Sequence, residues 1–299
     1  MQNMKPNFLS FLIIVLGFIS CNSQKELIKE GQKPQLISNE FEFTEGPAAD
    51  TEGNVYFTDQ PNNRIHKWSV EDGSVSVFME DAGRANGLYF DVEKDLLAAA
   101  DENSEIWKIT HQRDVKVLID DFEGKRLNGP NDLWVAPNGG IYFTDPYYQR
   151  DYWERTEKEI AEERVYYVNQ QGELSIVVDD LVQPNGIIGT PNGEILYIAD
   201  IGDNKTYSYK INPDGRLTDK KLFTELGSDG MTIDNMGNVY LTGNGVTIFD
   251  KSGKKIQHIR IDKDWTANVT FGGKKQQTLF ITAQEAIYSL QMNVKGVRW

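Results

Sequence analysis

Six acidic or amide residues recur along this chain at a spacing that suits a ring of metal ligands. They are Glu45, Asn86, Asn131, Asn185, Asp229 and Asn268, and successive positions differ by 41, 45, 54, 44 and 39 residues. Carboxylate and amide oxygens together form the hard, oxygen-only environment that Ca²⁺ prefers, and two carboxylates balance a divalent charge. The pattern therefore predicts a divalent-cation site, with Ca²⁺ favoured and Zn²⁺, Mg²⁺ and Mn²⁺ as alternatives.

A single Asn-Gly or Asp-Gly pair is more typical of a turn than of a ligand site. Six such residues in equivalent positions, two of them acidic, favour a site instead. The three histidines, at positions 66, 111 and 258, fall away from these positions. Zinc of the usual catalytic kind and a Ser-His-Asp triad therefore have no candidate histidine at this site.

The segments that follow these six residues are short strands. Asn54–Asp59, Ile141–Asp145 and Ile195–Asp200 are aromatic or β-branched runs, each preceded by a Gly, Asn or Pro turn. A repeat of forty to fifty residues built from such strands is the signature of a β-propeller. We therefore predict an all-β, six-bladed β-propeller over residues 35–299, with a ring residue at the start of each inner strand, pointing toward the axis.

Two departures from the repeat have structural consequences. The last repeat is one strand short, and Pro34–Ile37 is predicted to close the ring as the outer strand of that blade. An insertion, Tyr147–Glu163, separates the second and third strands of blade 3. Second strands run back toward the ligand face, so the insertion should overhang the channel mouth as a lid, with a helical turn over Arg155–Glu163. A surface excursion without substrate contact is the alternative.

The N-terminal region predicts export. Lys5 precedes an apolar run, Phe8–Ile19, that is short for a membrane span and typical of a secretory signal. Phe18–Cys21 resembles a bacterial lipoprotein cleavage box. We predict a signal peptide at residues 1–20, lipidation of Cys21, and a polar tether at residues 21–34 that holds the protein at the periplasmic side or the cell surface. Plain secretion is the alternative.

The amino-acid composition limits the kinds of molecule that this protein is expected to bind. The net charge is −14 and the pI about 4.7, so little on this chain would neutralise nucleic-acid phosphates. Cys21 is the only cysteine, so the chain has no partner cysteine for a disulfide and no other thiolate for catalysis. We expect a monomer that meets the membrane only through its lipid and binds a small molecule.

Five segments resemble one propeller family. They are FTEGP at 43–47, GKRLNGPNDL at 124–133, YFTDP at 142–146, QPNGI at 183–187 and SDGM at 228–231. Together they resemble the gluconolactonase branch of the senescence-marker-protein (regucalcin) family of six-bladed propellers. The resemblance runs from about Phe41 to near the C-terminus.

The resemblance implies a divalent metal, commonly calcium, with Glu45, Asn131, Asn185 and Asp229 as its ligands. Asn86 and Asn268 are then predicted to face substrate or stand behind the ligands. The family's sugar-binding Arg-x-Asn pattern is not reproduced, because Gly129 stands two residues before Asn131. Arg126 is predicted to reach the substrate in its place, together with two aromatic residues of the insertion, Tyr147 and Trp153.

The expected reaction is metal-assisted hydrolysis of a sugar lactone or a similar cyclic ester. The ion, held in part by Asn131, would stabilise the oxyanion that forms as water attacks. Asp229 is the candidate base, with direct nucleophilic attack by Asp229 as a second possibility. The alternatives are a promiscuous arylesterase or phosphotriesterase, and a non-catalytic ligand-binding propeller in which calcium is only structural.

Overall fold

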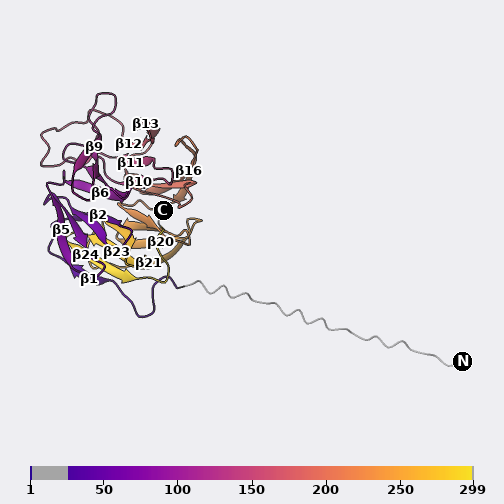
Figure 1. The fold of residues 1–299 in the computed structure, drawn as a ribbon. Helices are drawn as coiled ribbons and strands as arrows, with labels where there is room; N and C mark the ends of the chain where they lie inside the picture. The colour runs from indigo at the N-terminus through magenta and orange to yellow at the C-terminus, as the bar shows by residue number, and fades with distance from the viewer. Residues whose placement is uncertain (2–25, 298–299) are drawn as a thin grey trace.

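Short strands joined by tight turns build the whole of the described chain. The computed structural model describes residue 1 and residues 26–297, and this part forms six four-stranded antiparallel sheets. The all-β, six-bladed prediction is confirmed (Figure 1). No helix in the described residues is long and apolar enough to cross a membrane.

The first three blades follow one another along the chain. Blade 1 contains β2 (Thr44–Ala49), β3 (Val55–Asp59), β4 (Arg64–Trp68) and β5 (Val75–Glu80). Blade 2 contains β6 (Ala85–Phe90), β7 (Leu96–Ala100), β8 (Glu105–Ile109) and β9 (Val115–Ile119). Blade 3 contains β10 (Leu133–Val135), β11 (Ile141–Asp145), β12 (Arg164–Val168) and β13 (Leu174–Val178).

The last three blades complete the ring. Blade 4 contains β14 (Pro184–Gly189), β15 (Ile195–Asp200), β16 (Lys205–Ile211) and β17 (Leu217–Thr224). Blade 5 contains β18 (Met231–Ile233), β19 (Val239–Gly243), β20 (Gly245–Phe249) and β21 (Lys255–Ile259). Blade 6 contains β22 (Asn268–Gly272), β23 (Thr278–Ala283), β24 (Ala286–Gln291) and β1 (Gln35–Ser38).

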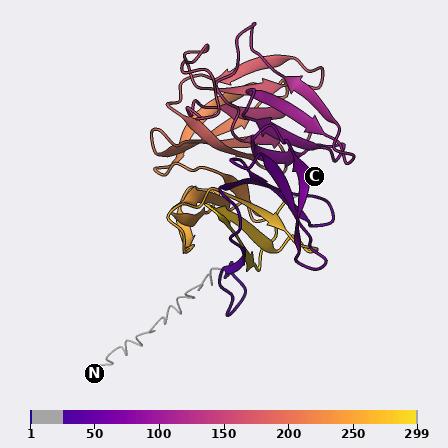
Figure 2. The ribbon, with the colours of Figure 1, turned by 90° about the vertical axis from the view of Figure 1, so that its left-hand side faces the viewer.

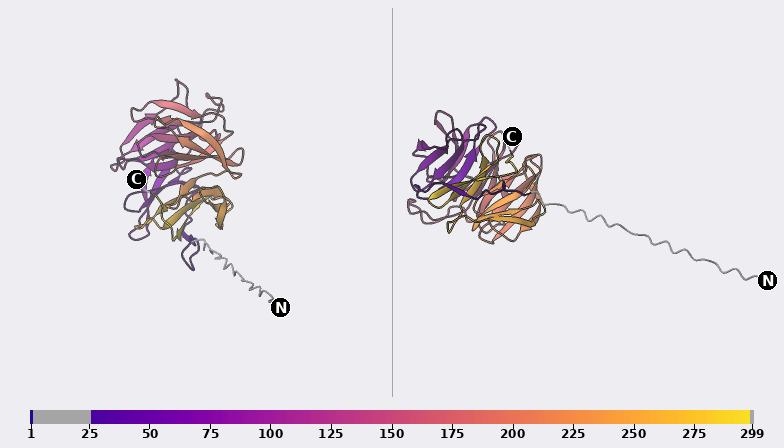
Figure 3. Two further views of the ribbon diagram at one scale, coloured as in Figure 1. Left: turned by 90° about the vertical axis from the view of Figure 1, so that its right-hand side faces the viewer. Right: turned by 90° about the horizontal axis from the view of Figure 1, so that it is seen from below.

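The N-terminal strand closes the propeller, as predicted. β1 pairs antiparallel with β24, with Gln35 opposite Ser289 and Leu36 opposite Tyr288. Figure 1 shows indigo β1 beside the yellow strands of blade 6. Each inner strand contacts the inner strands on both sides, and β2 contacts both β6 and β22. The inner strands therefore form a complete circle, which can be followed in Figures 2 and 3.

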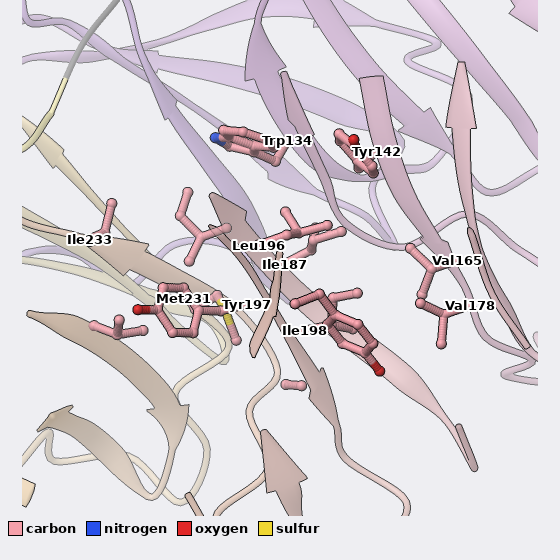
Figure 4. Close-up of a cluster of buried hydrophobic side chains, with 14 of the residues drawn as sticks. Trp134, Tyr142, Val165, Val178, Ile187, Leu196, Tyr197, Ile198, Met231 and Ile233 are labelled. Atoms are coloured by element: carbon pink, nitrogen blue, oxygen red, sulfur yellow. The ribbon is translucent and has the colours of Figure 1, made fainter. Parts of the chain in front are cut away.

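Apolar side chains between neighbouring blades hold this circle together. Figure 4 shows one such cluster, in which Trp134 and Tyr142 of blade 3 lie near Ile187 and Leu196 of blade 4. Blade 5 contributes Met231 from its inner strand. At about 25 cal/mol per Å² of apolar surface, this burial is the main force that holds neighbouring blades together.

The segment before β1 also packs on the propeller. Leu27 is buried against blades 5 and 6, and Asn293 donates its backbone N–H to the Leu27 carbonyl at 2.7 Å. The predicted tether at residues 21–34 therefore includes a stretch that lies on blade 6. The predicted signal peptide and Cys21 lie outside the described residues and stay predictions.

The insertion in blade 3 is irregular, and the helical turn predicted over Arg155–Glu163 is wrong. Hydrogen bonds from the insertion to the neighbouring loops take the place of the backbone hydrogen bonds that a helix would form. The guanidinium of Arg155 donates to the Leu127 carbonyl and to the Ser104 hydroxyl, both at 2.9 Å. The Trp153 indole donates to the Asp101 carbonyl at 2.9 Å. Tertiary contacts of this kind override the helix propensity of a Glu- and Lys-rich segment.

Candidate metal centre

The six ring residues lie where neighbouring inner strands begin, as the repeat predicted. Backbone hydrogen bonds join these starts across blades: Gly87 N–H to the Asn131 carbonyl at 2.7 Å, and Gly230 N–H to the Ala267 carbonyl at 2.9 Å. Residues far apart in sequence, 44 positions for Gly87 and Asn131 and 37 for Gly230 and Ala267, are thereby brought to one end of the channel.

Two glycines that follow ring residues permit this close approach. A Cβ on Gly46, where φ is +41°, would stand 2.0 Å from the Asn86 carbonyl oxygen. A Cβ on Gly230 would stand 1.9 Å from Cγ of Asn268. These glycines serve contact between blades at the axis rather than a hairpin turn.

Aspartates at the ends of second strands set the position of three predicted ligands. Each accepts two backbone N–H groups at 2.8–3.2 Å. The donors are Glu42 and Phe43 for Asp59, Asn128 and Gly129 for Asp145, and Val182 and Gln183 for Asp200. In every case the donors stand three and two residues before the ring residue, which is Glu45, Asn131 or Asn185. The carboxylates therefore hold in place the backbone segment that leads to each of these three ligands.

The acidic ring residues lie within range of each other's charge. Glu45 is 2% exposed, and burial followed by the charge of Asp229 raises the pKa of Glu45 well above its usual range. Burial raises the pKa of Asp229 to about 6, although hydrogen bonds from Trp265 and Asn185 lower it in part. The Trp265 indole N–H donates to Oδ2 of Asp229 at 2.6 Å. Two carboxylates close enough for the charge of one to raise the pKa of the other favour a cation between them.

A third carboxylate, Asp132, belongs to the same group and was missed by sequence reasoning. Burial is the main cause that raises its pKa to about 7, and the charge of Asp229 adds to it. The signal was its position directly after Asn131, where four of the other repeats have glycine. Asn268 hydrogen-bonds both Asp132 and Glu45 and lowers their pKa values. This residue, which was predicted to face substrate or to stand behind the ligands, therefore lies beside two of the carboxylates.

The donor set fits a divalent cation. The side-chain oxygens Oδ1 of Asn185 and Oδ1 of Asn86 are buried and have no hydrogen-bond partner. Among the described residues, no lysine or arginine forms an ion pair with Glu45, Asp132 or Asp229. Unpartnered amide oxygens beside carboxylates that form no ion pair are the surroundings that a hard ion such as Ca²⁺ would satisfy.

The insertion reaches this centre through Tyr148. Its hydroxyl accepts a hydrogen bond from Nδ2 of Asn185 at 2.9 Å, which leaves Oδ1 of the same amide facing away from Tyr148. Arg150 lies over the Tyr148 ring at 5.4 Å and pairs with buried Asp101 at 2.9 Å. The insertion therefore stands on the ligand face, where the topology argument placed it; its role as a lid stays a prediction.

Replacing Tyr148 with phenylalanine is expected to weaken metal binding about tenfold, because Asn185 loses the acceptor that fixes the orientation of its amide. Calorimetric titration of the metal-free protein with Ca²⁺ measures this. Tyr147→Phe is the matched control, since that hydroxyl donates to Gln149 within the insertion. Equal dissociation constants for the two variants would show that the Tyr148 contact does not orient the ligand.

The other predicted substrate-binding residues are spread more widely. Arg126 is exposed, and its backbone N–H donates to Glu159 of the insertion at 2.9 Å. Trp153 is buried and packs 5.7 Å from the ring of Tyr147. Arg150, which sequence reasoning did not single out, is the arginine whose charge lowers the pKa of Asp229. The substrate roles of Arg126, Tyr147 and Trp153 stay predictions.

A separate acidic group lies in the β6–β7 loop. Ligand oxygens of Asp91, Glu93 and Asp95 lie within 4.8 Å of one another. The ammonium of Lys108 pairs with all three, at 2.8 Å for Asp91 and 3.2 Å for Asp95. The Lys108 ammonium already balances part of the charge of these three carboxylates. The six ring residues at the starts of the inner strands are therefore the stronger candidate metal centre.

The fold and the ring define a class: six-bladed propellers that gather acidic and amide side chains at one end of the channel. The family model described as SMP-30/Gluconolactonase/LRE-like region matches residues 43–285. Because this match covers most of the chain, the protein belongs to that family, and the predicted resemblance is confirmed.

Known proteins agree with this assignment. A gluconolactonase of Zymomonas mobilis is 28% identical over 294 residues, which cover 88% of this chain and 82% of that protein. The structure of a gluconolactonase from Xanthomonas campestris is 28% identical with a TM-score of 0.83, covering 89% of this chain and 91% of that one. A calcium-binding regucalcin from Agrobacterium tumefaciens, 18% identical with a TM-score of 0.75, covers 89% of this chain and 96% of that one and shares the fold.

Proposed function

We propose that this protein is a divalent-metal-dependent lactonase that opens a sugar lactone. The observation that carries the proposal is that the charge of Asp229 acts on both Glu45 and Asp132 at the starts of the inner strands, where Oδ1 of Asn185 is buried without a hydrogen-bond partner. The similarity of this chain to two gluconolactonases supports a sugar lactone as the class of substrate. Glu45, Asn131, Asn185 and Asp229 would hold the ion, and Ca²⁺ suits this oxygen-only set best.

When bound, the ion supplies a Lewis acid for the lactone carbonyl oxygen as charge develops there. The protein's own contribution is to place a base beside that carbonyl. Asp229 is half-buried and ionised at neutral pH given a pKa of about 6, so its carboxylate can accept the proton of an attacking water. The Trp265 N–H donates to Oδ2 of Asp229 at 2.6 Å and so holds the carboxylate in one orientation.

Hydrolysis of a panel of lactones, aryl esters and phosphotriesters tests this function. Hydrolysis of lactones should disappear on treatment with a chelator and return when Ca²⁺ is added, and lactones should be turned over faster than the other two classes. Activity that survives complete removal of metal would contradict the role of the ion. Inactivity of the metal-loaded protein on the whole panel would instead favour a non-catalytic binding propeller.

A further inference from the structure

A cleft between blades 4 and 5 adjoins the candidate metal centre. It has a volume of about 650 Å³ and runs from Ser228 and Trp265, beside Asp229, down to Lys255 and His258 on β21. Ser228 is the residue directly before Asp229, and the Trp265 indole is bonded to Asp229. The cleft therefore adjoins the candidate metal centre through Trp265. Its volume lies within the usual range of small-molecule sites, about 300–1,000 Å³.

Trp265 lines the cleft and also contacts Asp229 of the candidate metal centre. It is 38% exposed, and no other tryptophan or phenylalanine among the described residues is exposed. Because its N–H is held by Asp229, the indole ring has a fixed orientation beside the opening. A rigid, exposed aromatic face bound at one edge is a platform on which an apolar face of a ligand can stack.

The rest of the lining is mixed: Ile201, Leu226 and Phe249 are apolar, and other residues supply hydrogen-bonding groups. Asn244 is exposed at the tip of the β19–β20 turn. Thr247 and Nδ1 of His258 share a hydrogen bond at 3.0 Å, which leaves Nε2 of His258 as the ring nitrogen available to a ligand. Thr224 and Lys255 add a hydroxyl and an ammonium. An acyl chain would leave these polar groups unpartnered, whereas a pyranose has one hydrogen-bonding rim and a C–H face.

We propose that this cleft is a subsite for a second sugar, so that the substrate is a lactone carrying a glycosyl group. The lactone ring lies at the metal centre, the glycosyl group stacks on Trp265, and its hydroxyls bond Asn244 and His258. The inference rests on the proposed lactonase function and specifies the substrate of that same site.

The test compares gluconolactone with its 4-O-glucosyl derivative on the Ca²⁺-loaded full chain. The wild-type protein should show the higher kcat/KM for the disaccharide lactone. The double variant Asn244→Ala/His258→Ala should lose about tenfold or more of that value, mainly through KM, because two hydrogen bonds are removed. Its kcat/KM for gluconolactone should stay within about twofold. Lys254→Ala, on the same hairpin but outside the cleft, is the matched control.

Equal losses for both substrates, or no preference for the disaccharide lactone in the wild-type protein, would overturn the subsite. Calorimetric binding of the disaccharide aldonate separates this outcome from failure of the proposed function. Binding that the double variant loses and Lys254→Ala retains would support the subsite even without turnover of any lactone. Absence of binding by the wild-type protein would reject it.

Discussion

Glu45→Gln is expected to abolish high-affinity metal binding and lactone hydrolysis together. Glu45 carries one of the charges that would balance the ion, and it is almost fully buried beside Asp229. Loss of a direct ligand should weaken binding by more than the roughly 10–100-fold typical of an outer-shell partner. Titration calorimetry with Ca²⁺ and a lactone assay over a range of Ca²⁺ concentrations measure the two effects.

The same variant should be more stable than the wild-type protein when no metal is present. The pKa of Glu45 is raised on folding, so the folded state holds its proton more tightly than the unfolded state does. The contribution of such a group is present below its unfolded pKa, about 4, and is lost as pH rises toward the folded pKa. The stability gained by Glu45→Gln in chelator should therefore grow as pH rises from about 4 toward the raised folded pKa of Glu45.

Urea denaturation in chelator at several pH values gives this difference directly. Glu52→Gln is the control, because Glu52 is an exposed carboxylate in a turn. If Glu45→Gln destabilised the metal-free protein at neutral pH, the carboxylates would not repel one another as the raised pKa values indicate. If it kept wild-type affinity for Ca²⁺, Glu45 would not be a ligand.

Much of the fold was predictable because its signals are local and repeated. Each blade carries its own turns and strands, so the period of forty to fifty residues survives the variation between repeats. Closure followed from counting strands: blade 6 lacked one, and Pro34–Ile37 had the right pattern to supply it. β1 at Gln35–Ser38 confirms that argument within one residue. The ring positions followed from the same repeat.

The insertion was less predictable because no repeat constrains it. Its path depends on Asp101, which follows the second strand of blade 2 at the place where Asp59, Asp145 and Asp200 accept backbone N–H groups in other blades. Asp101 instead accepts hydrogen bonds from side chains, including Arg150 at 2.9 Å and Tyr152. This burial of a charge beside an arginine fixes where the insertion lies, and therefore brings Tyr148 rather than Tyr147 to Asn185. Nothing in the local sequence distinguishes these neighbouring tyrosines.

Asp132 illustrates a different limit. The sequence did not single out Asp132, because the equivalent place after the ring residue is a glycine in four of the other repeats. The repeat reveals which position is equivalent but not how close its side chain comes to those of other blades. Only the packing of β10 between β6 and β14 brings Asp132 within range of the charge of Asp229 and of Glu45.

Asp229→Asn is expected to separate metal binding from turnover, unlike Glu45→Gln. The amide keeps an oxygen for the ion but cannot accept a proton, so kcat at saturating Ca²⁺ should fall by about 10²–10⁴-fold, the usual contribution of a general base. Binding should weaken more modestly. With its oxygen toward the ion, the amide would present N–H to the Trp265 N–H that now bonds Oδ2, leaving that indole without its partner.

A lactone assay and a Ca²⁺ titration on the same preparation decide this prediction. The double variant Asp229→Asn/Trp265→Phe removes the opposed N–H groups, so it should bind Ca²⁺ more tightly than Asp229→Asn while remaining as slow. Near-normal kcat in Asp229→Asn would show that another group takes the proton, and Asp132, with a pKa of about 7, would be the next candidate. Recovery of kcat along with Ca²⁺ affinity in the double variant would mean that Asp229 acts only as a ligand.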